Sequence, residues 1–315
     1  MPARKAAVVG IAGPSLTAEE AALLRRHRPL GAILFRRNVV DPAQVATLTA
    51  ALRDELGEEA PILVDQEGGR VARLRPPHWT EFPPPAAFEN GPGAAAEANA
   101  ALLGAECAAV GLDVVCAPCL DLRLPGAHEV IGDRAFGADP AEVARLGAAW
   151  IRGLQSAGCI PVIKHIPGHG RALVDSHESL PRVEASPAEL AADIAPFREL
   201  ADLGAWAMTA HILYAAWDSA RPATLSDAVI RDVIRGEIGF DGVLVSDDLA
   251  MGAMQGLSND LAGAAIEAGC DIVLHCTGVL AETAAILGTC PPLSDAALRR
   301  LGAARAARRP LPALA

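Results

Sequence analysis

The feature that most constrains the fold is a series of eight short apolar runs, rich in β-branched residues, that recur along the whole chain. Most of these runs are apolar at consecutive positions, which is typical of strands covered on both faces. They span residues 6–11, 31–35, 61–64, 113–117, 160–163, 205–209, 242–245 and 271–275. The sequence therefore predicts eight buried strands.

Helical segments lie between these runs, and several begin with a favourable N-cap. Thr17, Asp41, Asp139 and Ser186 each stand three residues before a Glu or Gln, and Pro directly follows three of the four. Strand and helix alternating eight times predict an α/β protein with a single (β/α)8 barrel, one catalytic domain over residues 1–315. The alternative is a doubly wound open sheet, although no Gly-x-Gly-x-x-Gly follows the first run.

Composition excludes several functional classes. The formal net charge is −11, and an acidic surface argues against nucleic-acid and membrane-surface partners. No apolar run is long enough to span a bilayer, and the short apolar N-terminus is interpreted as a first strand rather than a signal peptide. The seven cysteines are odd in number and stand mostly in apolar runs, which predicts reduced thiols and a cytoplasmic location.

Polar side chains follow five of the apolar runs at their C-terminal ends. They are Asp65-Gln66-Glu67 after the third run, Asp121 after the fourth, Lys164-His165 after the fifth, His211 after the sixth, and Asp247-Asp248 after the seventh. Active sites of (β/α)8 barrels lie at the C-terminal ends of the strands. We therefore expect these groups to converge on one mouth of the barrel.

A second cluster of polar residues follows the fifth run. Lys164-His165-Ile166-Pro167-Gly168-His169-Gly170 is followed by Asp175-Ser176-His177. Asp175 can bond one ring nitrogen of His177, fix its tautomer and leave the other nitrogen for proton transfer. An isolated Asp-x-His is weak evidence, because most such triplets are solvated turns, but its position after the Lys-His motif gives it more weight.

Asp247 is the best candidate for a nucleophile. If inward positions alternate along the strand, Val243, Val245 and Asp247 share one face and Asp248 points elsewhere. The alternative is that this acidic pair is a helix N-cap for the segment after Leu249.

The remaining polar groups suit a polyhydroxylated ligand. Lys164 and His165 can donate hydrogen bonds to hydroxyl groups, and Asp65 can accept them. Arg73 and Arg134 would add further donors, although ordinary salt bridges are the more usual role of a single Arg. Cys116-x-x-Cys119 resembles half of a zinc site, but no second cysteine pair and no His at ligand spacing accompanies it, so no metal is predicted.

Taken together, the motifs resemble glycoside hydrolase family 3, and within it the NagZ-type β-N-acetylglucosaminidases of Gram-negative bacteria. The resemblance extends over residues 8–280, in the family order. It rests on Asp65-Gln66-Glu67-Gly68-Gly69-Arg70-Val71-x-Arg73, Val130-Ile131-Gly132-Asp133-Arg134-x-Phe136-Gly137, Lys164-His165-x-Pro167-Gly168-His169-Gly170, Asp175-Ser176-His177 and Ser246-Asp247-Asp248-Leu249-x-Met251.

The resemblance implies a role for each motif. It implies that Asp247 is the nucleophile and that His177, paired with Asp175, is the acid/base. The implied ligands of the N-acetylglucosamine are Asp65, Arg73, Arg134, Lys164 and His165.

The resemblance also implies the reaction. This is retaining exo-hydrolysis, through a covalent glycosyl-enzyme, of terminal β-1,4-linked N-acetylglucosamine from 1,6-anhydro-N-acetylmuramic acid and its muropeptides during peptidoglycan recycling. It implies no metal and no organic cofactor. We expect a monomer whose partner is a small carbohydrate.

Three alternative functions remain open at this point. The first is a β-N-acetylglucosaminide phosphorylase on the same fold, because a neutral imidazole repels phosphate less than a carboxylate does. The second is a metal-dependent amidohydrolase using His165, His169, His211 and Asp247, although the His-x-His expected after the first strand is missing. The third is a non-catalytic sugar-binding module, which would leave Asp247 and the Asp175–His177 pair without a use.

Overall fold

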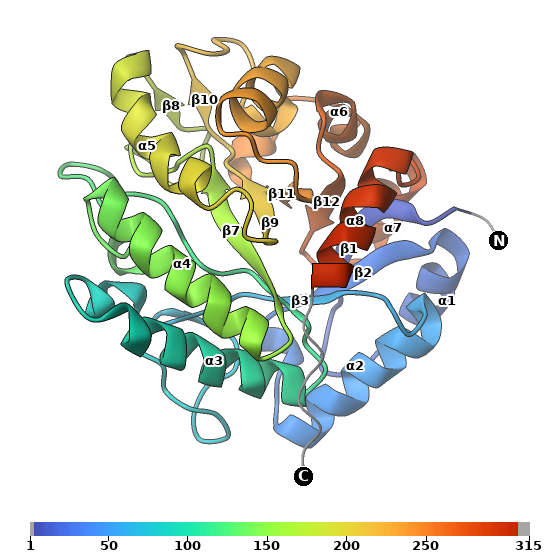
Figure 1. The fold of residues 1–315 in the computed structure, drawn as a ribbon. Helices are drawn as coiled ribbons and strands as arrows, with labels where there is room; N and C mark the ends of the chain where they lie inside the picture. Colours follow the sequence, from blue (N-terminus) through green and yellow to red (C-terminus); the bar gives the residue numbers. More distant parts are fainter. Residues whose placement is uncertain (1–2, 308–315) are drawn as a thin grey trace.

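Eight parallel strands close into one barrel in a computed structural model that describes residues 3–307 (Figure 1). Their order around the barrel is β1-β12-β11-β9-β7-β6-β3-β2. The barrel strands are β1 (Lys5–Gly10), β2 (Pro29–Leu34), β3 (Ile62–Val64), β6 (Val114–Val115), β7 (Ile160–Ile166), β9 (Trp206–Thr209), β11 (Leu244–Asp248) and β12 (Ile272–His275). The predicted (β/α)8 barrel is confirmed, and the open sheet is wrong because β1 pairs with β12.

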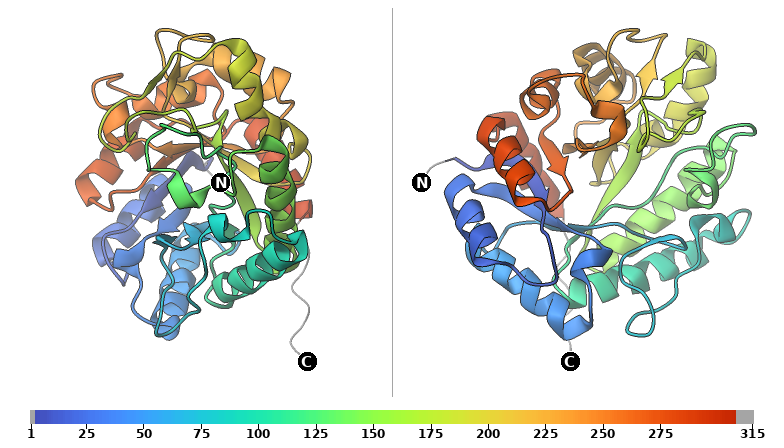
Figure 2. Two further views of the ribbon diagram at one scale, coloured as in Figure 1. Left: turned by 90° about the vertical axis from the view of Figure 1, so that its left-hand side faces the viewer. Right: turned by 180° about the vertical axis from the view of Figure 1, so that it is seen from behind.

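Helices surround the strands on the outside of the barrel (Figures 1 and 2). They are α1 (Ala18–His27), α2 (Pro42–Leu56), α3 (Gly93–Ala109), α4 (Pro140–Ser156), α5 (Pro187–Glu199), a π-helix (Val229–Glu237), α6 (Leu261–Ala268), α7 (Leu280–Thr289) and α8 (Asp295–Ala307). Short 3₁₀ turns span Arg36–Asn38, Pro85–Phe88, Gly132–Arg134, Ala223–Leu225 and Gly252–Met254.

The four predicted N-caps all form. The Thr17 and Ser186 hydroxyls accept the amide three residues on, and Glu20 and Glu189 complete two capping boxes. Asp41 accepts the amide of Gln44, whereas Asp139 accepts the amide two residues on. Each cap satisfies an amide that the first helical turn leaves without a partner. Local sequence therefore determines where these helices begin.

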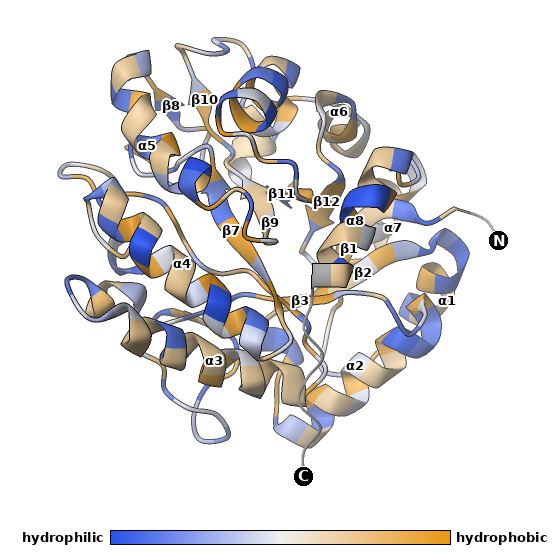
Figure 3. Cartoon of the chain, viewed as in Figure 1, coloured by the Kyte–Doolittle hydropathy of each residue, from blue (hydrophilic) through white to orange (hydrophobic). Residues whose placement is uncertain are grey.

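The barrel strands are buried on both faces, which explains their uninterrupted apolar runs. All seven residues of β7 and all six of β2 are buried. Apolar colour gathers on the strands at the centre, and the outer faces of the helices are more polar (Figure 3). Burial on both sides favours β-branched residues at every position, because inner and outer faces both pack against apolar neighbours.

The largest differences from the predicted C-terminal ends of the strands are in β6, β7 and β11. The fourth run pairs only at Val114–Val115, whereas β7 continues to Ile166 and β11 to Asp248. The polar residues expected after the fifth and seventh strands therefore lie within the last residues of these strands. Pairing continues there with a shift in register, between Lys164 and Ile166 and between Val245 and Asp248. These shifts are irregularities of the kind that re-aim side chains next to active sites.

Two small sheets lie in the loops that follow barrel strands. β4 (Gln66–Gly68) and β5 (Val71–Ala72) form an antiparallel hairpin after β3. β8 (Arg182–Val183) pairs in parallel with β10 (Leu213–Tyr214). Within residues 3–307, no helix is both long and apolar enough to cross a membrane. Residues 1–2 and 308–315 of the predicted domain lie outside the described residues.

Candidate active site

A cavity of about 300 Å³ opens at the C-terminal ends of the barrel strands. Four of the residues predicted to act on the substrate line it: Asp65, Arg73, His177 and Asp247. Phe35, Met208, Met251 and Leu274 supply apolar wall, and Arg37, Asp248, Cys276 and Thr277 also line the cavity. Polar groups from separate strand ends therefore meet at one mouth, as expected for a barrel of this type.

Asp247 is the acidic side chain at the end of β11. Its Oδ1 accepts the amide of Asp248 at 2.8 Å, and within residues 3–307 no hydrogen bond or ion pair holds Oδ2. Burial alone would raise the pKa of this carboxyl. The imidazoles of His211 and His165 outweigh burial and hold the pKa of Asp247 below its ordinary value. An ionised carboxylate with one unused oxygen in a cavity can attack a carbon centre or stabilise a cation.

Asp248 has a different environment from Asp247. Its Oδ1 accepts the amides of Ala250 and Cys276, each at 3.0 Å. Burial raises the pKa of this carboxyl. Neither aspartate is a helix N-cap, because Met251 caps the next helical segment; Asp248 holds the turn after β11, whereas Asp247 keeps an oxygen that no hydrogen bond among residues 3–307 uses.

The Asp175–His177 pair forms as the spacing indicates. Oδ1 of Asp175 lies 2.7 Å from Nδ1 of His177 and also accepts the His177 amide at 2.9 Å. Partial burial opposes ionisation of Asp175, but the contacts with His177 outweigh it and lower the pKa of this carboxyl. The His177 side chain is 64% exposed, which leaves Nε2 accessible from the cavity that the residue lines. This arrangement suits an imidazole that exchanges protons with a ligand.

The loop that carries His177 is docked onto the segment that follows Asp247 and Asp248. The carbonyls of Ser176 and His177 accept the amides of Ala253 and Gly252, each at 3.1 Å. A Cβ on Gly252 would lie 2.6 Å from the carbonyl oxygens of His177 and Glu178. Only glycine permits this approach of two backbones. The contact places the imidazole beside the carboxylate end of β11.

A network of buried ion pairs supports Asp65. Its two oxygens accept from Nζ of Lys164 at 2.9 Å and from Nη2 of Arg73 at 2.8 Å. Lys164 also lies 2.6 Å from Glu67, whose two oxygens bind the guanidinium of Arg134, both at 2.9 Å. Well-paired charges of this kind hold their geometry, because losing one partner would leave an uncompensated buried charge.

Two opposing effects set the pKa values of this network: burial disfavours the charged forms, and neighbouring opposite charges favour them. Burial would raise the pKa of Asp65 and of Glu67, yet the neighbouring cations outweigh it. The pKa of Glu67 falls to about 2, and that of Asp65 falls well below its ordinary value. Burial would lower the pKa of Lys164, but the two carboxylates raise it. The cluster is therefore fully ionised at neutral pH.

Asp121 orients the imidazole next to Lys164. Its carboxylate is fully buried and lies 2.6 Å from Nδ1 of His165. It also accepts the amides of His165 at 3.2 Å and of His169 at 2.6 Å. Burial would raise the pKa of Asp121, but His165 and His169 lower it. With Nδ1 bonded to a carboxylate, Nε2 of His165 is the ring nitrogen left for a ligand.

The predicted residues are not all equivalent in the structure. Lys164 and His165 contact Asp65 and Asp121, but neither is among the residues that line the cavity. Arg134 is only 9% exposed, binds Glu67 and does not line the cavity either. Its contact with a sugar therefore stays a prediction.

Sequence reasoning gave no role to three further residues. Glu67 and Asp121 stand inside the strand-end motifs. Their position after an apolar run is the sequence feature that could have indicated their role in the site. Arg37 lines the cavity and donates to the carbonyls of Ile11 and Cys276, which ties together the ends of three strands. Arg37 belongs to a pair of arginines directly after the second apolar run, and this position could have indicated its place at the mouth of the barrel.

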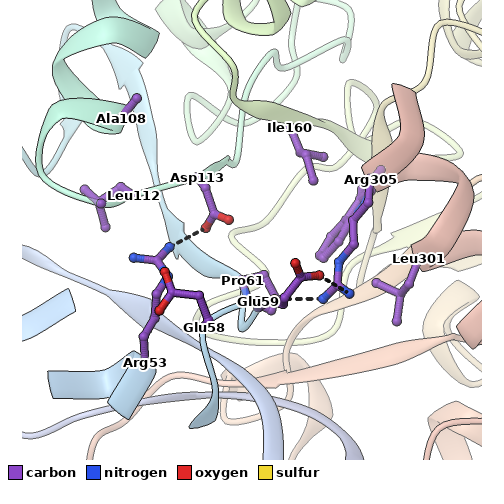
Figure 4. Close-up of a pocket in the computed structure, with 12 residues that line it drawn as sticks. Arg53, Glu58, Glu59, Pro61, Ala108, Leu112, Asp113, Ile160, Leu301 and Arg305 are labelled. Atoms are coloured by element: carbon purple, nitrogen blue, oxygen red, sulfur yellow. Dashed lines mark hydrogen bonds and ion pairs between the residues drawn. The ribbon is translucent and has the colours of Figure 1, made fainter. Parts of the chain in front are cut away.

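A larger cavity of about 470 Å³ lies at the opposite end of the barrel. Pro61, Asp113, Ile160 and Trp206 line it from the starts of β3, β6, β7 and β9. Figure 4 shows two ion pairs among its charged residues, Arg53 with Asp113 at 3.3 Å and Arg305 with Glu59 at 3.0 Å, and Glu58 also lines it. The N-terminal end of such barrels serves stability, so the smaller cavity is the candidate active site.

Comparison with known proteins agrees with this geometry. Residues 6–295 match the model of the glycosyl hydrolase family 3 N-terminal domain. The β-hexosaminidase of Alkalilimnicola ehrlichii is 42% identical over 310 residues, covering 93% of this chain and 87% of the relative. The β-hexosaminidase of Pseudomonas aeruginosa is 41% identical over 278 residues, covering 85% and 81% of the two chains.

Solved structures give the same result. NagZ of Neisseria gonorrhoeae, in complex with N-trifluoroacetyl-D-glucosamine, superposes with a TM-score of 0.86 at 36% identity, covering 96% of this chain and 90% of that one. A family 3 β-N-acetylglucosaminidase from Paenibacillus has a TM-score of 0.87 at 36% identity, covering 96% of this chain and 61% of that one. The chain belongs to glycosyl hydrolase family 3.

Proposed function

We propose that this chain is a retaining exo-β-N-acetylglucosaminidase that releases terminal β-1,4-linked N-acetylglucosamine from 1,6-anhydro-N-acetylmuramic acid and its muropeptides. The broader statement, a glycoside hydrolase of the β-N-acetylhexosaminidase class, rests on the family match and on the β-hexosaminidase relatives. The NagZ structural neighbours support the finer assignment to peptidoglycan recycling.

One observation carries the proposal: Asp247 and His177 line the same cavity. In the first step, Oδ2 of Asp247 attacks the anomeric carbon while Nε2 of His177 gives its proton to the glycosidic oxygen. The bond between the anomeric carbon and the glycosidic oxygen breaks. In the second step, His177 removes a proton from water, the oxygen attacks the anomeric carbon, and Asp247 leaves. Two inversions retain the β-configuration.

The Asp175 carboxylate supports the proton transfers. It lies 2.7 Å from Nδ1 of His177, so it fixes the tautomer with the reactive lone pair on Nε2 and stabilises the imidazolium. Most retaining glycosidases use two carboxyl groups. In this chain His177, hydrogen-bonded to Asp175, would take the role of the second carboxyl group.

The sugar would be held by the ionised groups around Asp65. Lys164 and Arg73 each occupy one oxygen of Asp65, which leaves lone pairs for two sugar hydroxyls. Nε2 of His165 adds a further hydrogen-bonding atom at the neighbouring position. Arg134 supports this set through Glu67, which in turn holds Lys164. A cavity of about 300 Å³ is at the lower end of the range for small-molecule sites, which favours a single terminal sugar.

We further propose that residues 1–315 act as one catalytic domain, as a monomer in the cytoplasm. The seven cysteines are all free and buried in the structure, which supports a reducing compartment.

The proposal can be tested with a slow fluorinated N-acetylglucosaminide and mass spectrometry. We expect a stable sugar adduct on the peptide that contains Asp247, and no adduct on an Asp247→Asn control. Hydrolysis without an adduct, or an adduct on another residue, would contradict the covalent mechanism. Purified anhydromuropeptides test the substrate: N-acetylglucosamine should be released with overall retention.

The same assay in phosphate buffer tests the phosphorylase alternative. Free N-acetylglucosamine is expected as the product at every phosphate concentration. Accumulation of N-acetylglucosamine 1-phosphate would replace the hydrolase assignment.

A further inference from the structure

Ser176 stands between the two residues of the proposed acid/base pair and is buried, although both neighbours face the solvent. Ser176 is 3% exposed, whereas the side chains of Asp175 and His177 are 24% and 64% exposed. The reaction steps described above do not use its hydroxyl group. Buried polar groups in proteins are normally hydrogen-bonded, so the partner of this hydroxyl shows where the segment is attached to the rest of the protein.

The hydroxyl of Ser176 contacts a second buried side chain, that of His169. Oγ lies 3.2 Å from Nε2 of His169, and both residues are buried. Burial, and then the nearby His165, lower the pKa of His169 to about 4, so the ring is neutral at neutral pH. Within residues 3–307, Nδ1 of this ring has no hydrogen-bond partner. The bond to Ser176 is therefore the one hydrogen bond of the His169 ring in the described part of the chain.

His169 is itself held in place just after the end of β7. Its amide donates to Asp121 at 2.6 Å, and its ring packs against that of His165 with the ring centres 5.4 Å apart. The hydroxyl of Tyr214 donates to the carbonyl of the preceding Gly168 at 2.7 Å. His169 therefore gives Ser176 a fixed point of attachment to the barrel.

The bond between Ser176 and His169 closes the loop that carries the acid/base pair. Leu173 and Val174, in the middle of this loop, are 68% and 41% exposed, so their packing does little to fix it. On the other side, the carbonyl of Ser176 accepts the amide of Ala253 at 3.1 Å. The side chain of Ser176 thus ties the loop to the end of β7, and its main chain ties the loop to the segment after β11.

We propose that Ser176 is a positioning residue, whose hydroxyl bond to His169 holds Nε2 of His177 at the glycosidic oxygen. The inference rests on the proposed function, because it takes His177 as the acid/base. Without the hydroxyl, the backbone contact with Ala253 would still attach the loop, but the imidazole could move away from the linkage. A displacement of about 1 Å can cost on the order of 10²-fold in rate, and the remaining contact should limit the loss to about tenfold.

Ser176→Ala tests this role on a series of aryl N-acetylglucosaminides, with kcat/KM as the measure of the first step. The loss should reach about tenfold for the phenyl glycoside, whose leaving group needs the proton, and stay below about threefold for the 2,4-dinitrophenyl glycoside. A merely structural role would lower the amount of folded enzyme and reduce kcat/KM by one factor for every substrate. Ser179→Ala, the same substitution at an exposed serine of the same segment, should leave the whole series unchanged.

A double variant tests whether the bond to His169 carries the effect. His169→Phe keeps a ring against His165 and removes both ring nitrogens, so it should show the same dependence on the leaving group as Ser176→Ala. If both substitutions break one bond, their combination should cost no more than about twofold beyond either alone.

Three results would overturn the positioning role: no change in Ser176→Ala, an equal loss for all leaving groups, or losses that multiply in the double variant. His177→Ala separates these results from a failure of the proposed function. A steeper dependence on the leaving group in His177→Ala, with no change in Ser176→Ala, would leave the proposed function standing and remove only the role of Ser176. The same dependence in the wild type and in His177→Ala would show that His177 is not the acid/base, and both would fall.

Discussion

The two ends of the barrel each carry a cavity lined by charged residues, but the charges are used differently. At the N-terminal end, Arg53 and Asp113 bind each other, as do Arg305 and Glu59 (Figure 4). At the C-terminal mouth, Asp247 keeps an oxygen without a hydrogen-bond partner among residues 3–307, and His177 keeps an exposed ring nitrogen. In the larger cavity four of the five charged side chains form ion pairs with each other.

Cavity size therefore does not indicate where the active site of this barrel lies. Groups that pair with each other contribute to stability, whereas groups held in place with unused lone pairs are available for a ligand. Substitutions at the mouth should therefore reduce the rate with little loss of stability, and substitutions at the opposite end should do the reverse.

The largest effect is expected for Asp247→Asn. An amide cannot form the glycosyl-enzyme, so kcat should fall by about 10⁴-fold or more. The midpoint of urea unfolding should change little, because within the described residues the Asp248 amide is the one hydrogen-bond donor to this carboxylate. Steady-state kinetics and urea titration check the two parts. A variant with more than a tenth of the wild-type kcat would remove Asp247 from the mechanism.

His177→Ala should reduce kcat by about 10²–10⁴-fold for substrates with poor leaving groups, which is the usual value of proton transfer. Activated aryl glycosides, whose leaving groups need no proton, should lose much less in the first step. A series of aryl N-acetylglucosaminides measures this dependence. An equal loss across the series would argue for a structural role, and Asp175→Asn should follow the same trend with a smaller loss.

Gly252→Ala tests how the His177 loop is positioned. The added methyl would overlap the carbonyls of His177 and Glu178 at 2.6 Å and push the loop outward. A shift of about 1 Å in a catalytic group can cost on the order of 10²-fold in rate, so kcat should fall by about 10–100-fold with little change in KM. Gly288→Ala, where a Cβ meets nothing within 4 Å, is the matched control. Equal rates for both variants would contradict the docking role of Gly252.

The buried imidazole of His169 should make the stability of the protein depend on pH. Burial, and then the nearby His165, lower the pKa of His169 from 6.5 to about 4 in the folded state. Between these values the unfolded chain binds more protons, so the free energy of unfolding decreases as the pH falls from about 6.5 to about 4. Between pH values above 6.5 and below 4, the titration of His169 should lower the free energy of unfolding by about 3 kcal/mol in total.

His169→Gln removes this titration and should flatten the pH profile in that window. Urea unfolding of both proteins at half-unit steps of pH between 4 and 8 measures it. Parallel profiles for the two proteins would show that His169 does not titrate as its burial indicates.

The smallest effects are expected at the N-terminal cavity. Asp113→Asn weakens bonds to Arg53 and to the Ile62 amide and should cost about 1 kcal/mol of stability. Arg305→Gln breaks an exposed pair and should cost at most about 1 kcal/mol. Both variants should keep kcat/KM within about twofold. A tenfold loss of kcat/KM without unfolding would mean that this cavity also serves catalysis.

Much of the fold could be predicted because its signals are local. Runs apolar at consecutive positions indicated all eight barrel strands, and the caps at Thr17, Asp41, Asp139 and Ser186 form as their spacing indicates. Strand ends were less accurate, because Lys164 and Asp248 are polar residues that still pair with a neighbouring strand. Hydrogen bonding to a neighbouring strand, which composition does not reveal, decides where a strand ends.

The residues alone predicted the alternation of strands and helices, the end at which polar groups gather, and the Asp175–His177 contact, because each of these signals lies within a few residues. Only the tertiary structure decided that Arg134 binds Glu67, that Gly252 docks the His177 loop, and that Cys119 lies beside Asp121 and His165. These contacts join segments far apart in the chain. Their geometry depends on how the strands close and pack, and no local pattern encodes it.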